Sequence, residues 1–220
     1  MMKKLYLVLI LIVLLLIFFF FLPAQGQRRI ERGTFSIYFM EEKVGYEEYT
    51  WEEDASGYLL TVRGRMTKPA SIEIDELKIR VDKNFVAQSF YFKGSVSGME
   101  QEAFSTISEG NVENRIKVGD HESQTTLKIR RDAFLLPNPV FSPYMIITRK
   151  YRCLLSEKVT LSAYIIPQLE VSFTLEPKEI PCTLQVDISG IKVELQTDEG
   201  GELKALFIPA QNLEVIRTGF

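Results

Sequence analysis

The stretch GTFSIYFMEEKVGYEEYTW, residues 33–51, decides the fold, because apolar and polar residues alternate on both sides of a short turn signal. In its first half the alternation places Phe35, Ile37 and Phe39 on one face of an extended chain. A period of two is typical of half-buried β-strands. The connection EEKVG is too short for anything but antiparallel neighbours. The stretch therefore predicts a β-hairpin.

The same alternation continues through the second half of this hairpin, where Tyr49 and Trp51 share a face, and onward towards the C-terminus. In YLLTVRGRM it places Leu60, Val62 and Met66 together, and it continues as far as SQTTLKI, which gives eight strands before residue 131. It resumes from VTLSAYII to NLEVIR and adds about six more strands. Turn signals such as DASG, SEGN and DEGG separate the runs, and they predict a meander rather than a βαβ protein.

The segment FLLPNPVFSPYMIITRKYRCLL, residues 134–155, breaks this pattern with three prolines. Ser142 is suited to cap a helix whose first residue is Pro143, where the missing N–H costs nothing. Apolar residues then follow one helical stripe, at Tyr144, Ile147, Tyr151 and Leu154 or Leu155. We predict one short helix near 143–154.

The expected fold class is mainly β, an antiparallel meander of about fourteen strands with that single helix. So many strands are too many for one flat open sheet. The sheet must therefore curve into a half-barrel or split into a two-layer sandwich, and the sequence leaves both open. We treat 27–220 as one β domain, with two halves joined at 131–157 as an alternative.

The N-terminal segment is an export signal by composition. Lys3 and Lys4 precede an uncharged run from Leu5 to Leu22, and Ala24-Gln25-Gly26 offers small residues at a cleavage site before Gln27. The run of 18 residues is long for a signal peptide and slightly short for a membrane span of about 20 residues. We therefore interpret 1–26 as a signal peptide or an N-terminal membrane anchor, with a periplasmic or cell-envelope location.

The charge balance argues against nucleic acid as a partner. The whole chain has a net charge of −3, and without residues 1–26, which hold two lysines and no acids, it is −5. Phosphate binding needs a concentrated cationic face, which this composition does not offer. The membrane remains a partner through the N-terminal segment if that segment is not cleaved.

Two cysteines, Cys153 and Cys182, are the whole thiol inventory. An even count in an oxidising compartment predicts one disulfide, which would close a loop of about 30 residues. Two separate core cysteines are the alternative. Their spacing, and the presence of one histidine, His121, predict no zinc or redox centre.

No catalytic residue, metal ligand or cofactor is predicted. His121 lies in VGDHES at an expected hairpin turn, an unsuitable place for a catalytic base. Acidic pairs such as Glu47 and Glu48 point to opposite faces of a strand, so spacing alone does not bring them together. We interpret the acids as solvated strand faces, and we expect no enzyme activity.

The aromatic and aliphatic residues of the first strands are the candidate ligand-binding residues. They share one face that would form an apolar trough if the sheet curls without closing. The set is Phe35, Ile37, Phe39, Tyr49, Trp51, Leu60 and Val62. The alternative is that these side chains fill a sandwich core.

A signal-like start, a long antiparallel meander and a helix break resemble the half-barrel of bacterial periplasmic lipoprotein carriers and related exported domains of unknown function. The opening hairpin of residues 33–51 is similar to the first hairpin of such exported domains. The resemblance implies an envelope protein that binds a hydrophobic or lipid-like ligand or an envelope protein, without catalysis. A structural or assembly module with a packed core, or a hydrolase based on carboxylates, is the competing interpretation.

Overall fold

The computed structural model describes residues 29–166 and 169–219, so the predicted signal or anchor at 1–26 lies outside the described residues. The described residues form fifteen strands, one α-helix and two 3₁₀ turns. In chain order these are β1 (Arg29–Phe39), β2 (Glu42–Asp54), β3 (Gly57–Met66), β4 (Ile72–Asp82), β5 (Ala87–Val96), β6 (Met99–Ser108), β7 (Asn111–Val118), β8 (His121–Lys128), β9 (Phe134–Leu135), α2 (Tyr144–Tyr151), η1 (Arg152–Leu154), β10 (Val159–Ile165), β11 (Leu169–Pro177), β12 (Thr183–Ile188), β13 (Ile191–Thr197), β14 (Leu203–Ile208), η2 (Pro209–Gln211) and β15 (Leu213–Arg217).

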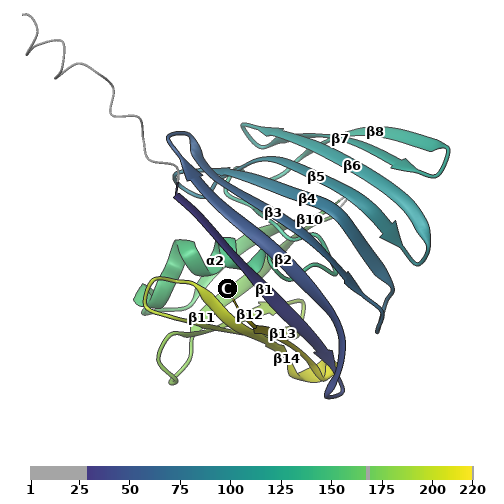
Figure 1. Cartoon of the computed structure of the whole chain (residues 1–220). Helices are drawn as coiled ribbons and strands as arrows, with labels where there is room; N and C mark the ends of the chain where they lie inside the picture. The colour runs from purple at the N-terminus through teal and green to yellow at the C-terminus, as the bar shows by residue number, and fades with distance from the viewer. Residues whose placement is uncertain (1–28, 167–168, 220) are drawn as a thin grey trace, which may run out of the picture.

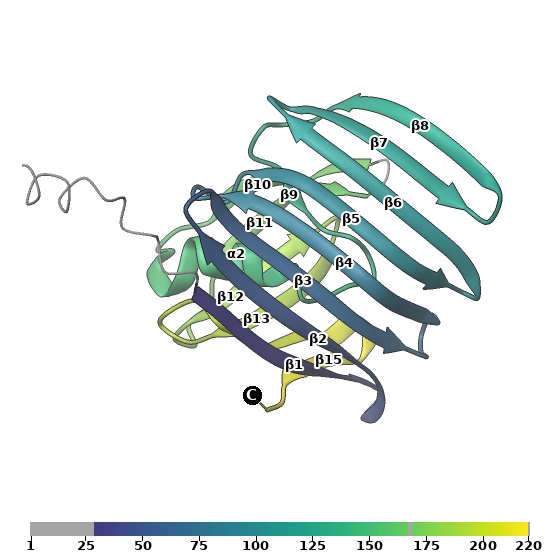
Figure 2. The same cartoon turned by 45° about the horizontal axis from the view of Figure 1, so that its top comes forward.

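All fifteen strands belong to one sheet, in the order β8 to β1 followed by β15 to β9. Neighbours along the chain pair antiparallel in both halves, which Figure 2 shows for β1 to β8, so the predicted meander is confirmed. The halves join where β1 pairs with β15, with Phe35 opposite Arg217. The fifteenth strand, β9, has two residues and runs parallel to β10, and a strand this short carries no alternation for sequence analysis to find.

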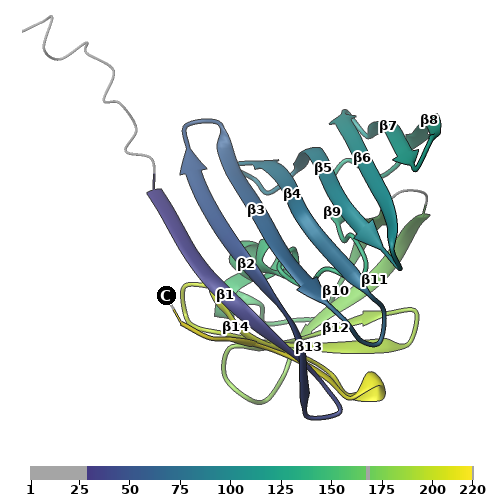
Figure 3. The same ribbon diagram turned by 45° about the vertical axis from the view of Figure 1, so that its right-hand side comes forward.

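The sheet is open and curled. It therefore combines features of both expected alternatives, the half-barrel and the two-layer sandwich. Its two halves face each other as two layers with α2 between them (Figures 1 and 3). Strands far from the β1–β15 junction also lie close to each other. The side-chain amide of Asn114 on β7 donates a 2.8 Å hydrogen bond to the hydroxyl oxygen of Tyr164 on β10. The layers therefore enclose one core without the sheet closing into a barrel.

The single predicted helix is confirmed as α2 followed by η1, but its start differs from the prediction. The N-cap is Pro143, with no side-chain cap, and the helix proper begins at Tyr144. The hydroxyl of Ser142 donates to the carboxylate of Glu47 on β2 instead of capping the helix. The expected stripe is only partly buried, because Ile147 is inaccessible whereas Leu154 is exposed.

The segment from Ala133 to Thr148 fills the inner side of the curled sheet. Its apolar side chains belong to the same buried cluster as the inner faces of β1 to β4 and of β12 to β15. The buried members of the segment are Ala133, Phe134, Leu135, Leu136, Val140, Phe141, Met145, Ile146 and Ile147. A stretch of the chain itself therefore occupies the space where an open trough would be.

Candidate functional site

A buried carboxylate fixes this inner segment against the sheet. Glu47 lies on the inner face of β2 and is 1% exposed. One of its oxygens accepts a 2.9 Å hydrogen bond from the amide of Phe141, and the other accepts a 2.7 Å bond from the amide of Ser142 and a bond from the Ser142 hydroxyl. Burial raises the pKa of Glu47, against the opposing effect of these hydrogen bonds.

An apolar groove of about 410 Å³ opens beside this anchor. One wall is the Leu136–Phe141 stretch with Tyr144, and burial raises the pKa of Tyr144 to about 12. The opposite wall is formed mainly by aliphatic side chains of Met66, Ile188, Ile191, Val193, Ile208 and Leu213. A concave, mostly apolar site of this size is typical of small-molecule binding.

A smaller hollow of about 90 Å³ lies on the other side of the same inner segment. Pro137, Asn138 and Val140 line both spaces. The far wall of the small hollow is formed by β4 to β7, with Phe90 and Phe92 among its residues. The Pro137–Val140 stretch is thus a thin partition between two apolar spaces.

A polar cleft of about 490 Å³ lies where the starts of β1 and β3 and the end of β2 meet the end of α2 and the β13–β14 turn. Glu31 organises it, because its carboxylate pairs with Arg149 at 2.5 Å and with Arg217 at 3.4 Å. Arg217, whose side chain is 7% exposed, also pairs with Glu202 at 2.7 Å. The hydroxyl of Tyr49 donates to Glu31 at 3.1 Å, and burial raises the pKa of this tyrosine.

A row of stacked rings forms another wall of the polar cleft. Trp51 stacks on Tyr58 with ring centroids 5.3 Å apart, and Tyr58 stacks on Phe85 at 4.8 Å. The guanidinium carbon of Arg149 lies 4.6 Å from the centroid of Trp51, which is a cation–π contact. Aromatic rings and charged side chains therefore face the same space.

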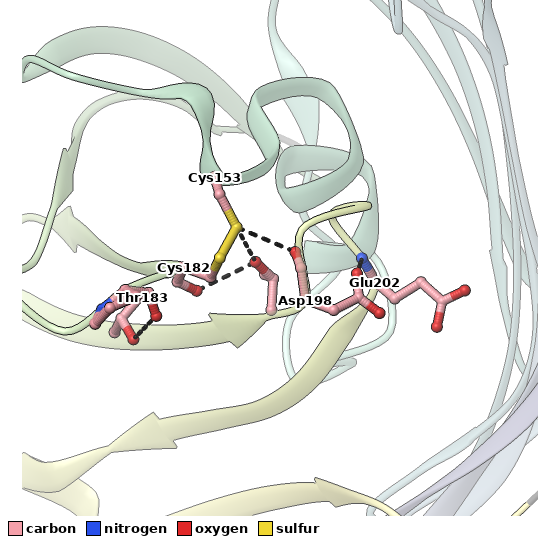
Figure 4. Close-up of a disulfide and its surroundings, with 7 residues drawn as sticks. Cys153, Cys182, Thr183, Asp198 and Glu202 are labelled. Carbon is pink, nitrogen blue, oxygen red and sulfur yellow. Dashed lines mark hydrogen bonds between the residues drawn. A yellow bond between two sulfur atoms is a disulfide. The ribbon is translucent and has the colours of Figure 1, made fainter.

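Cys153 and Cys182 form a disulfide beside the β13–β14 turn, which contributes Asp198 and Glu202 to the lining of this cleft (Figure 4). The bond joins η1, at the end of α2, to the turn before β12. Cys153 Sγ also lies 3.2 Å from the carbonyl oxygen of Asp198, and the hydroxyl of Thr197 donates to the carbonyl of Cys182 at 3.1 Å. The covalent link thereby positions the β13–β14 turn, residues 198–202, against α2.

The seven predicted ligand-binding residues are brought together, as side chains of one packed inner face. Six are at most 4% exposed, and Phe39 is half-buried. Trp51 lines the polar cleft, and Tyr49 joins its ion-pair network. The apolar groove is lined instead by residues further along the strands and by the C-terminal half.

Sequence reasoning missed the residues that organise both spaces. Glu47 was interpreted as a solvated acid, although its alternation with Tyr49 and Trp51 places it on the buried face. No sequence motif marked Arg149 or Arg217 as residues of a site. Their association with Glu31 depends on the pairing of β1 with β15 and on the position of α2, which no local pattern encodes.

Other chemistry is sparse in the described residues. They contain no group of three or more histidine, cysteine, aspartate or glutamate side chains arranged to hold a metal ion. His121 is exposed at the start of β8. No helix within residues 29–166 and 169–219 is long and apolar enough to cross a membrane.

Comparison with known proteins gives one fold-level likeness. No family model matches the chain, and no curated protein matches it. A crystal structure of a DUF1089 family protein from Pseudomonas aeruginosa is similar with a TM-score of 0.45 and 12% sequence identity, over 86% of this chain and 91% of that one. This finding does not extend to lipoprotein carriers, and a likeness at this level assigns no function.

Proposed function

We propose that this is an exported bacterial cell-envelope protein that acts by non-catalytic binding of a hydrophobic or lipid-like ligand in the apolar groove. The observation that carries the proposal is the groove itself, about 410 Å³ in volume and lined mainly by apolar side chains, with Asn138 and Gln211 as polar members. Removing an acyl chain from water contributes about 0.8 kcal/mol for each buried CH₂ group. A groove of this kind therefore favours an aliphatic chain over a polar ligand.

The groove differs from the trough expected from the sequence. The trough residues of β1 to β3 pack against the inner segment, whereas the groove lies between the middle of that segment, with Pro137 and Tyr144, and strand β13, with Ile191 and Val193. Ile191 is 44% exposed, so the mouth of the groove presents an aliphatic side chain to solvent. This combination supports a site that admits a chain from outside without opening the core.

A structural or assembly module without a ligand is the second candidate. It is favoured by the way the segment from Ala133 to Thr148 fills the concave side of the sheet. The two candidates differ in one property, which is whether the apolar groove takes up a ligand from solution.

Ligand uptake is tested with residues 27–220 and a fluorescent fatty acid below its micelle concentration. Saturable binding, displaced by unlabelled fatty acid or lysolipid, is expected. Ile191→Asp places a charge at the groove mouth and should abolish binding. Ile180→Asp is the matched control, because Ile180 is 58% exposed and does not line the groove. Absence of saturable binding to the unmodified protein would favour the structural module.

Export is tested separately, by fractionating a Gram-negative host that expresses the full chain. A periplasmic protein beginning at Gln27 would indicate cleavage, and an intact N-terminus in the membrane fraction would indicate an anchor. The control is the same chain without residues 1–26, which should stay in the cytosol. A full-length chain found in the cytosol would contradict export.

A further inference from the structure

We propose that the polar cleft is a second binding site, and that its ligand is an acidic sugar, meaning a saccharide that carries a carboxylate or phosphate group. The cleft shares no lining residue with the apolar groove. The proposal is therefore independent of lipid binding, and either can fail without the other.

Arginine side chains of the cleft support a ligand with an anionic group. Arg29 and Arg152 line the cleft and are exposed, and in the described residues the guanidinium group of neither forms an ion pair or a hydrogen bond. Arg149, the third arginine of the lining, uses one Nη for Glu31, while its buried Nε has no hydrogen-bond partner in the described residues. Guanidinium groups bind carboxylate and phosphate with paired, charge-assisted hydrogen bonds.

The acids of the cleft do not oppose such a ligand, because most of them are already neutralised. Cations outside the lining pair with four of the five acids. The pairs are Glu31 with Arg217, Glu53 with Lys83, Asp198 with Lys204, and Glu202 with both Lys204 and Arg217. Glu31 also pairs with Arg149, which is part of the lining. The fifth acid, Glu199, is exposed on the β13–β14 turn. The guanidinium groups of Arg29 and Arg152 are thus positive charges of the lining that form no ion pair with another described residue.

The remaining lining suits the rest of a sugar. A hydroxyl group both donates and accepts hydrogen bonds, and the cleft offers carboxylate acceptors beside guanidinium donors. The stacked row of Trp51, Tyr58 and Phe85 adds an apolar wall for the C–H face of a sugar ring. An aliphatic chain would leave these charged groups without partners, at a cost in free energy.

The site is preorganised by the disulfide that Figure 4 shows. Arg152 precedes Cys153 and has a φ of 51°, a conformation that a non-glycine residue adopts only when its surroundings enforce it. The bond to Cys182 supplies that constraint, and the β13–β14 turn packs against Arg152 through Gly201. The backbone of Arg152 is therefore held at the cleft before any ligand arrives, which lowers part of the entropic cost of binding.

Trp51 makes the proposal directly testable, because it is the one tryptophan of the chain and lines the cleft. Residues 27–220 are titrated with trigalacturonate and with glucose 6-phosphate, while tryptophan fluorescence is followed and the binding heat is measured. At least one should give a saturable change that weakens as salt is added. Maltotriose, which is neutral, should bind at least about tenfold more weakly, because it lacks the charge-assisted bonds.

Variants locate the binding. Arg152→Gln and Arg29→Gln should each weaken binding about tenfold or more, since each removes charge-assisted hydrogen bonds. Arg131→Gln is the matched control, an exposed arginine outside the cleft, and it should bind as the unmodified protein does. Ile191→Asp should leave sugar binding unchanged.

The proposal is overturned if neither acidic sugar binds, if maltotriose binds equally well, or if the two cleft variants bind like the control. Inorganic phosphate and vesicles containing an anionic phospholipid are tested for binding in the same way. Binding of phosphate as tight as that of the sugar phosphate would reduce the site to a general anion site. Binding to the vesicles alone would replace the sugar with a lipid headgroup.

Discussion

The carboxylate of Glu47 and the amide of Ser142 lie 95 residues apart in the chain and 2.7 Å apart in the folded protein. This bond, with the neighbouring bond from Phe141, attaches the inner segment to the first half of the sheet. It therefore determines where the partition between the two apolar spaces lies. The segment begins α2 immediately afterwards, so the same contact also sets the position of the helix.

The first prediction concerns the pH dependence of stability at Glu47. Burial raises the pKa of Glu47 in the folded state above the ordinary value of 4.5, which applies to the unfolded state. At a pH between 4.5 and the folded-state pKa, the folded state therefore binds more protons than the unfolded state. The free energy of unfolding should therefore fall as pH rises through this window. Glu47→Gln should remove that loss. The measurement is urea denaturation between pH 4 and pH 8.

Two further variants separate charge from hydrogen bonding. Glu47→Ala should cost about 2 kcal/mol or more at every pH, because two buried amides lose their acceptor. Glu48→Gln on the exposed side of the same strand is the control and should leave the pH profile of the unmodified protein unchanged. A Glu47→Gln profile parallel to that of the unmodified protein would contradict the raised pKa.

The second prediction concerns the disulfide. Replacing Cys153 and Cys182 by serine should lower the free energy of unfolding by about 3 to 4 kcal/mol, because a loop of this length regains its freedom in the unfolded state. Urea denaturation with and without reductant measures this loss. Reductant should destabilise the unmodified protein by a similar amount and leave the double variant unaffected. An unmodified protein that is insensitive to reductant, with the bond shown to be cleaved, would contradict the stabilising role.

The third prediction concerns the approach of the β13–β14 turn to α2. Gly201 has a φ of +84°, and a Cβ at this position would lie 2.5 Å from the carbonyl oxygen of Thr148. Gly201→Ala should therefore displace the turn and weaken the polar cleft. Gly190→Ala is matched in backbone strain, with a φ of +88°, but has nothing within 4 Å of the added carbon.

Denaturation and Trp51 fluorescence distinguish these two glycine variants. Gly190→Ala should lose about 1 to 2 kcal/mol from the left-handed conformation alone and keep its emission spectrum. Gly201→Ala should lose more and shift the emission, because Trp51 lines the same cleft as the turn. Equal losses with unchanged spectra would show that the turn accommodates a methyl group.

Local patterns in the sequence predicted most of the elements. Alternation located β1 to β8 and β10 to β15, and the three prolines marked where the sheet is interrupted. These signals work because each depends on neighbours a few residues away. Glu47 could have been placed in the core by the same rule, since it alternates with Tyr49.

The sites depend on relationships that alternation does not encode. The polar cleft joins Arg29, Arg149 and the 198–202 turn through the pairing of the first strand with the last. The apolar groove exists because the inner segment fills the concave face, and the sequence left both a hollow trough and a filled core open. Both outcomes follow from contacts between residues far apart in the chain.

The last prediction decides how completely that face is filled. Ile37 is 1% exposed and belongs to the buried cluster, so Ile37→Ala should remove packed contacts and leave a cavity. The expected loss is about 2 to 5 kcal/mol in the free energy of unfolding, as for truncation in other closed cores. Ile30→Ala on the same strand is the control, since Ile30 is 48% exposed, and it should cost about 0.5 kcal/mol or less. Thermal or urea denaturation measures both. Similar small losses would mean that the inner face of β1 borders an open space, and fatty-acid binding would then be sought there as well as in the groove.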